Sequence, residues 1–233
     1  MLYLIVIATG IFSLIYVPSQ IAVPNDATAT VNSILASGHL FRIGMVAGLV
    51  CHIAFLLLPF ALYKLLSPSG KDTAVLMVAF AVIQTPIYFV NLCNKLDVLS
   101  ILSGAGYLQA FTTAQLNAKV MLSLAAYGNG MLALEILMGL WLLPFGYLVF
   151  KSDFLPKTLG ILLMAGCFGY LIDFTGTVLF PGYANMSIAS YVTLPATFGE
   201  IGICLWLLIV GVRDRPISSG CGDPDQSISQ GAH

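Results

Sequence analysis

Three acidic residues lie inside apolar stretches of the sequence, where a charged side chain is costly. Glu135 lies near the middle of the stretch 123–151, and Asp173 and Glu200 lie in two later stretches. A charge at the centre of a bilayer costs about 2.5–3.5 kcal/mol on insertion scales, so such residues usually face a protein interior and mark a functional site. The three carboxyls are therefore candidate proton donors and acceptors, and they are the catalytic candidates if the protein is an enzyme.

Helical spacing adds polar and aromatic side chains to the faces that carry these acids, because residues three or four apart share a helix face. At about 1.5 Å per residue, Glu135 and Glu200 fall near mid-bilayer, and Asp173 falls in the half away from most basic residues. The acids thus lie at mid-bilayer or on the outer side of it, which predicts an acidic cavity open to the outer half of the membrane. The candidate ligand-binding residues are Arg42, Tyr88, Asn91, Tyr127, Tyr170 and Thr197.

Structural roles compete with these functional ones. Each acid could simply hydrogen-bond a neighbouring helix, and Arg42 could extend to the membrane interface instead of holding an anionic group or an acid. His52, alone on its helix, is expected to be a satisfied core residue. Pro86 and Pro195 could expose backbone carbonyls to a ligand, or they could be ordinary kinks.

Composition indicates a protein whose solvent is the bilayer. Of 233 residues, 59% are hydrophobic and 8% are charged, and the mean hydropathy is +0.96. Soluble domains carry about 25% charged residues. The net charge of −1 and the lack of a basic stripe argue against nucleic acid as a partner. Five cysteines and three histidines show no zinc-site spacing, so neither a metal nor another cofactor is expected.

The apolar stretches predict an all-α, polytopic bundle of six transmembrane helices, since a span needs about 20 mainly apolar residues. Pro18 is expected to end the first span, Asn25 or Asp26 to cap a short surface helix, and Asp72 to cap the third span. Thr112 and Gln115 have the spacing of a capping box. The predicted spans are 2–17, 39–66, 73–94, 123–151, 159–180 and 188–212, in one domain over 1–215 followed by a disordered polar tail, 216–233.

The basic residues near the span ends predict the orientation, because Lys and Arg are in excess on the cytoplasmic side. One side carries six and the other carries three, so both termini are expected in the cytoplasm. The larger group is Lys64, Lys71, Lys151, Lys157, Arg213 and Arg215, and the smaller is Arg42, Lys95 and Lys119.

Four segments resemble the integral-membrane family known as domain of unknown function 4386. They are HLFRIG (39–44), YLQAFTTAQL (107–116), GYLVFKSDFLPKTLGILL (146–163) and GYLIDFTG (169–176), and the likeness runs to about Arg215. The resemblance implies a six-span helical bundle, multi-pass in a bacterial inner (plasma) membrane, and it supplies no activity. Arg42 and Asp173 lie on recurring motifs of the family. At the position of Glu135 the family pattern has apolar residues instead. Trp141 occupies a position where the family often has a histidine.

Three classes of function remain open. The first is a carrier or receptor for a small lipophilic or cationic molecule, in which the acids neutralise the ligand or relay protons; such a protein could form a homodimer around a shared path. The second is an intramembrane acid–base enzyme on a lipid or isoprenoid, comparable to membrane terpene cyclases only by analogy. The third is a structural or regulatory membrane subunit. The sequence does not decide whether the protein is an enzyme.

Overall fold

The computed structural model describes residues 1–24, 26–183 and 186–210, and all regular elements in this part of the chain are helices. Six helical segments are long and apolar enough to cross a membrane, which confirms the predicted all-α bundle of six spans. The elements are α1 (Leu2–Gly10), η1 (Ile11–Tyr16), α2 (Val17–Ile21), α3 (Ala27–Ala36), α4 (Gly38–Leu66), η2 (Ser67–Ser69), α5 (Lys71–Ile101), η3 (Gly106–Ala110), α6 (Thr113–Lys151), α7 (Lys157–Leu179), α8 (Ser187–Tyr191) and α9 (Leu194–Ile209).

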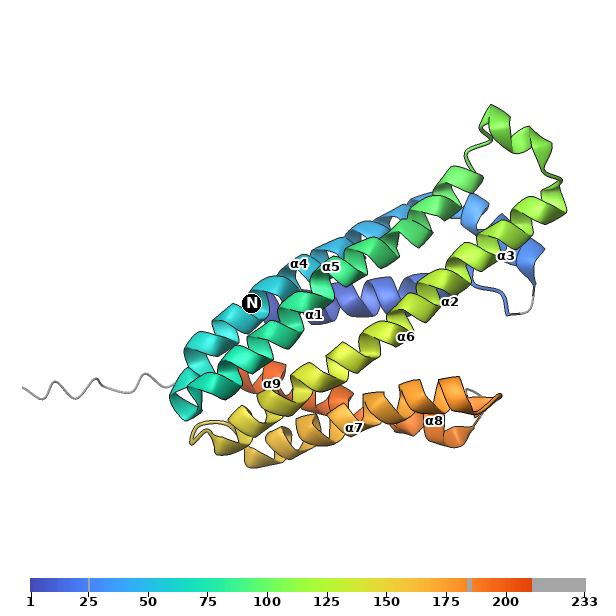
Figure 1. The fold of residues 1–233 in the computed structure, drawn as a ribbon. Coiled ribbons are helices and arrows are strands. Elements are labelled where there is room, and N and C mark those ends of the chain that lie inside the picture. The colour runs from blue at the N-terminus through green and yellow to red at the C-terminus, as the bar shows by residue number, and fades with distance from the viewer. Residues whose placement is uncertain (25, 184–185, 211–233) are drawn as a thin grey trace, which may run out of the picture.

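The long helices pack in a curved row, in the order α1, α4, α5, α6, α7 and α9 (Figure 1). The row closes only lightly, because α1 packs mainly on α4 and α9 packs mainly on α7, with few contacts between α1 and α9. Met1 and Leu208 line the same pocket, so the N-terminus and the end of α9 lie at one end of the bundle. Asn185, Arg213, Arg215 and the predicted tail 216–233 lie outside the described residues.

The first span is longer than predicted and does not end at Pro18. Helical structure runs on to Ile21, and the six residues before α2 form a π-helical turn, η1. Proline is tolerated in the first turn of a helix, where its missing N–H is not needed. Pro18 holds that position in α2, directly after the wider π turn. The π turn therefore lets the chain carry a proline through the span instead of stopping there.

Two of the three helix starts predicted from capping residues are confirmed. Asp26 caps α3 by accepting a hydrogen bond from the Ala29 amide at 2.8 Å. Thr112 and Gln115 form the predicted capping box at the start of α6. The prediction for Asp72 was wrong, because α5 begins at Lys71 after Gly70. Asp72 lies in the first turn instead, where a negative charge is favourable at the positive end of the helix dipole.

Pro195 does not kink a continuous helix in the sixth span. The helix is interrupted, so that α8 ends at Tyr191 and α9 starts at Leu194 with Pro195 in its first turn. Pro86, by contrast, lies inside the continuous helix α5, which extends seven residues beyond the predicted end at Asn94.

Two apolar clusters fill the two ends of the bundle, and polar residues lie between them. The larger cluster joins α4, α5, α6, α7 and α9 at the end where the N-terminus lies, and it includes Leu62, Met77 and Trp141. The smaller cluster joins α2, α3, α4, α5 and α6 at the other end, and it includes Ile34 and Val120. The middle of the bundle is therefore where buried polar side chains must find their partners.

Small residues allow α6 and α7 to pack backbone against backbone, as is common between transmembrane helices. A Cβ atom on Gly146 would lie 2.7 Å from the Gly160 carbonyl oxygen and 2.9 Å from the Met164 backbone nitrogen. A Cβ atom on Gly160 would lie 2.7 Å from the Gly146 carbonyl oxygen. The two glycines thus set the distance between the helices that carry Glu135 and Asp173.

We expect Gly146→Val to destabilise the protein by about 1–3 kcal/mol, the usual cost of overpacking a close interface. Thermal unfolding in detergent, followed by intrinsic fluorescence, measures the change. The matched control is Gly128→Ala on the same helix, where an added Cβ meets nothing within 4 Å. This control should melt at the wild-type temperature or above it, because alanine favours helix. Equal melting temperatures for Gly146→Val and the wild type would contradict the packing argument.

Candidate functional site

Two of the three predicted acids meet directly at the interface of α6 and α7. The carboxyl of Glu135 lies within hydrogen-bonding reach of the carboxyl of Asp173, so close that the two groups repel each other when both are charged. Both residues are partly buried. Oxygen Oε2 of Glu135 is buried and has no hydrogen-bond partner among the described residues. The pair is therefore an acceptor-rich centre with unused capacity for a proton, a hydrogen-bond donor or a cation.

The third acid belongs to the same neighbourhood, and Tyr170 connects it to the pair. The phenol of Tyr170 on α7 is within electrostatic reach of Glu200 on α9 and of both Glu135 and Asp173. A Cβ atom on Gly139 of α6 would lie 3.3 Å from the Cβ of Tyr170, so the tyrosine packs against the Glu135 helix. We call Glu135, Tyr170, Asp173 and Glu200 the acid centre. Tyr170 is thus the residue that relates Glu200 to the pair of Glu135 and Asp173.

Tyr183 joins the acid centre from the loop after α7, a segment in which helical spacing predicts no contributor. Its ring packs against Gly176, where a Cβ atom would lie 2.5 Å from a ring carbon. Its buried hydroxyl lies close to the Asp173 carboxyl without meeting the full geometry of a hydrogen bond. Burial, and after it the neighbouring carboxyl, raises the pKa of Tyr183 above its ordinary value. The phenol is thus kept neutral, as a donor, beside an acceptor.

Tyr3 and Cys51 complete the side of the centre formed by α1 and α4. The phenol of Tyr3 and the thiol of Cys51 both lie within electrostatic reach of Glu200. The Cys51 thiol donates to the Val6 carbonyl oxygen at 3.4 Å, whereas the buried Tyr3 hydroxyl has no hydrogen-bond partner within the described part of the chain. Sequence reasoning missed Tyr3 because α1 carries no acid and its spacing relates it to none.

The acid centre contains no base to balance it. Across the residues that the structure describes, none of Glu135, Asp173 and Glu200 forms an ion pair, and no Lys, Arg or His is among the groups that act on Glu135 or Glu200. The described residues also contain no group of three or more His, Cys, Asp or Glu side chains that could hold a metal ion. The acid centre therefore offers negative charge or shared protons, and its tyrosine hydroxyls are neutral hydrogen-bond donors.

A second polar group lies between α5 and α6 and uses three of the predicted ligand-binding residues. Asn91 donates to the backbone oxygen of Tyr127 at 3.0 Å, and the Lys95 ammonium lies 4.0 Å from the centre of the Tyr127 ring. Gln84 donates to the Leu137 oxygen on α6 at 3.2 Å. Tyr88 and Tyr127 are buried, and their hydroxyls have no hydrogen-bond partner among the described residues. These polar residues of α5 therefore face α6, away from lipid.

His52 and Ser13 join this second group from α4 and the π turn. The His52 ring stacks on Tyr88 with 3.3 Å between centroids, and its Nδ1 donates to the Gly48 carbonyl oxygen at 2.9 Å. His52 is thus held in place as a packed residue of the core. Ser13 is fully buried and donates to the Gly44 carbonyl oxygen at 2.8 Å, so the π turn is fastened to α4. No residue pattern in 11–16 predicts the π turn.

Two predicted ligand-binding residues lie apart from both groups. Arg42 is exposed on α4, where the buried face runs through Phe41, Gly44 and Met45. Thr197 is exposed on α9, and its hydroxyl donates to the Thr193 carbonyl oxygen in its own helix at 3.4 Å. Neither residue is placed to contact a ligand in the acid centre.

We expect Tyr183 to ionise above the ordinary phenol pKa of about 10, and Asp173→Asn to lower its pKa. The fall should be partial, because burial is the larger cause of the shift. The Cζ resonance in ¹³C-tyrosine-labelled protein, assigned by its loss in Tyr183→Phe, measures the titration. Because an unfolded phenol ionises at lower pH, the stability that Tyr183 contributes is present below about pH 10 and falls as pH rises toward the folded-state pKa.

Asp97→Asn is the control for this titration, since Asp97 is an exposed acid on α5. It should leave the Tyr183 resonance unchanged at every pH. A Tyr183 titration that Asp173→Asn does not move would show that the two side chains are not neighbours.

Comparison with known proteins gives the family of the chain and no activity. No solved structure matches it. It is similar to an uncharacterized protein of Archaeoglobus fulgidus, with 31% identity over 153 residues that make up 65% of this chain and 73% of the relative. The family model described as Domain of unknown function (DUF4386) matches residues 1–211. The chain therefore belongs to the DUF4386 family, as its motifs at 39–44, 107–116, 146–163 and 169–176 predicted.

Proposed function

We propose that the protein binds a small lipophilic cation within the membrane, with the acid centre as its binding site. The observation that carries the proposal is that three carboxyls share one phenol, Tyr170, with no base among them. Two neighbouring carboxylates repel each other, and each is costly to bury alone. A cation seated between Glu135 and Asp173 would remove both costs at once.

The unused hydrogen-bonding groups support a ligand at this site. The Glu135 Oε2 and the hydroxyls of Tyr3 and Tyr183 are buried without hydrogen-bond partners among the described residues. Buried polar atoms are nearly always paired in folded proteins, so an unpaired group calls for an explanation such as water or a ligand. Three such atoms around one set of carboxyls suit a ligand that has a charged head and polar hydrogens.

The aromatic residues favour an organic cation over a metal ion. Tyr170 lies beside all three carboxyls, and aromatic faces attract ammonium groups by about 0.5–2 kcal/mol. Oxygen-loving metal ions instead require several carboxylate or carbonyl ligands on one ion. A lipophilic organic cation can also reach the site from the bilayer, since its apolar groups partition into lipid.

The proposal places the protein in the inner (plasma) membrane with both termini in the cytoplasm. Helical bundles belong to that membrane, because the spanning proteins of bacterial outer membranes are β-barrels. The orientation rests on the Lys and Arg count at the span ends. Neither a homodimer nor another subunit is needed to build the site, since one chain supplies all its residues.

We expect benzyltrimethylammonium, a small permanent cation, to bind the purified protein in a non-ionic detergent, and Glu135→Gln to weaken binding about tenfold or more. Tenfold corresponds to ~1.4 kcal/mol, and removing one charge at close range in a partly buried site costs at least that much. Isothermal titration measures both affinities. The affinity should also fall on acidification, because protons compete for the carboxylates and the ligand itself cannot titrate.

Two controls make this test specific. Asp97→Asn removes an exposed acid of α5 outside the acid centre and should leave the affinity unchanged. Neopentylbenzene, which has the same shape without the charge, should bind equally to wild type and Glu135→Gln. Size-exclusion chromatography shows whether each variant is folded and monodisperse. A folded Glu135→Gln variant with wild-type affinity for the cation would refute the proposal.

A further inference from the structure

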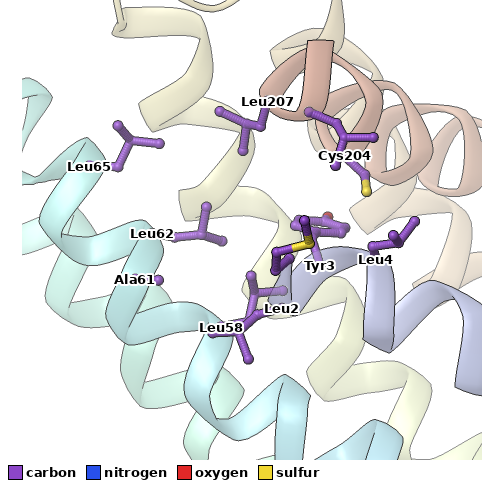
Figure 2. A pocket seen from close by; sticks show the side chains of 11 residues that line it. Leu2, Tyr3, Leu4, Leu58, Ala61, Leu62, Leu65, Cys204 and Leu207 are labelled. Carbon is purple, nitrogen blue, oxygen red and sulfur yellow. The ribbon is translucent and has the colours of Figure 1, made fainter. Parts of the chain in front are cut away.

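A pocket of about 390 Å³ lies at the light contact between α1 and α9 and is open at the end of the bundle that carries the N-terminus. Figure 2 shows leucines of α4, among them Leu58 and Leu62, on one side and Cys204 and Leu207 of α9 on the other. Apart from Tyr3 and Cys204, its lining consists of Leu, Met and Ala side chains. We call it the α1–α9 pocket. Its volume is typical of a small-molecule site, about 300–1,000 Å³.

Tyr3 is the side chain that the pocket and the acid centre have in common. It lines the pocket (Figure 2), it is only 8% exposed, and its buried hydroxyl has no hydrogen-bond partner among the described residues. Glu200, Cys204 and Tyr170 are the groups that act electrostatically on its phenol. The apolar pocket therefore borders Glu200, through Tyr3 and through Cys204, which lies one helical turn after Glu200 on α9.

The carboxyl of Glu200 lies beyond Tyr3, on the side away from the leucines of the pocket. A molecule with a cationic head is attracted to the acid centre. Its apolar tail would then point along the leucines toward the end of the bundle.

We propose that the α1–α9 pocket receives the alkyl chain of an amphiphilic amine whose charged head sits in the acid centre. This inference rests on the proposed function and narrows the ligand from any lipophilic cation to one with an alkyl chain. Tyr3 lies where head and chain join, and its hydroxyl is available to a polar group at that junction. The pocket also gives such a ligand a route between α1 and α9, where the helix row is least tightly closed.

Photo-crosslinking to the purified full chain tests the inference. The probe is dodecyltrimethylammonium with a diazirine at the far end of its chain, and adducts are located by mass spectrometry after proteolysis. We expect adducts on 1–4, 58–65 and 204–208, and we expect benzyltrimethylammonium to suppress them by competing for the acid centre. A dodecyl alcohol with the same diazirine reports the background labelling that lipid-like chains produce anywhere on the surface.

Ala61→Phe should fill the pocket and reduce its adducts to the level of the alcohol probe. Ala61 lines the pocket but is exposed, so the larger side chain need not disturb the core. Ala79→Phe, at an exposed alanine of α5 outside the pocket lining, is the matched control and should label like the wild type. Leu208→Phe, also exposed and pocket-lining, repeats the test should Ala61→Phe fail to fold.

The two proposals fail in different ways. If benzyltrimethylammonium binding does not depend on Glu135, the proposed function is wrong and this inference is rejected with it. If the small cation binds as expected but the adducts lie on other surfaces, or remain in Ala61→Phe, the site is real and the alkyl-chain inference is overturned.

Discussion

A carboxyl group surrounded by lipid must either keep a proton or face a partner, and three helices of this bundle each carry one. The fold answers this constraint by bringing Glu135 and Asp173 together, with Tyr170 between this pair and Glu200. Convergence shields the acids from hydrocarbon, but it also brings like charges together. A shared proton or a bound positive charge would relieve this repulsion, and the proposed function builds on that possibility.

Close helix packing makes that convergence geometrically possible. Gly146 and Gly160 bring the backbones of α6 and α7 together, and Gly199 packs against Leu163 of α7, next to Glu200. In a membrane, where apolar side chains gain little from leaving lipid, such close contacts supply much of the association between helices. Because these glycines have no side chain, the acid-bearing helices come near enough for their side chains to interact.

Sequence periodicity predicted the number and type of the spans, because these depend on local patterns. It failed where the relevant face depends on packing. On α9 the buried positions are Ala196, Gly199, Ile203 and Cys204. Thr197, one residue after Ala196, therefore turns outward although it is three residues from Glu200. Spacing alone relates two residues of a helix to each other, and it does not say which of them faces the core.

The contributors that sequence reasoning missed come from places where periodicity carries no information. Tyr3 lies at the start of a span, among apolar residues in the sequence. Tyr183 lies in the turn after Pro181 and Gly182. Both reach the acids only because the chain brings α1 beside α9 and folds the loop back over Gly176. Contacts of this kind are long-range in origin, so neither helical spacing nor composition could have indicated them.

The length of α6 has a consequence for the face of the protein opposite the N-terminus. Its 39 residues correspond to roughly 58 Å at about 1.5 Å per residue, well beyond a hydrocarbon core of about 30 Å. Part of α6 therefore extends beyond the hydrocarbon core. Its first turns pack with α3 and with the ends of α4 and α5 around Ile34 and Val120, so an extension at this end would be supported by neighbouring helices.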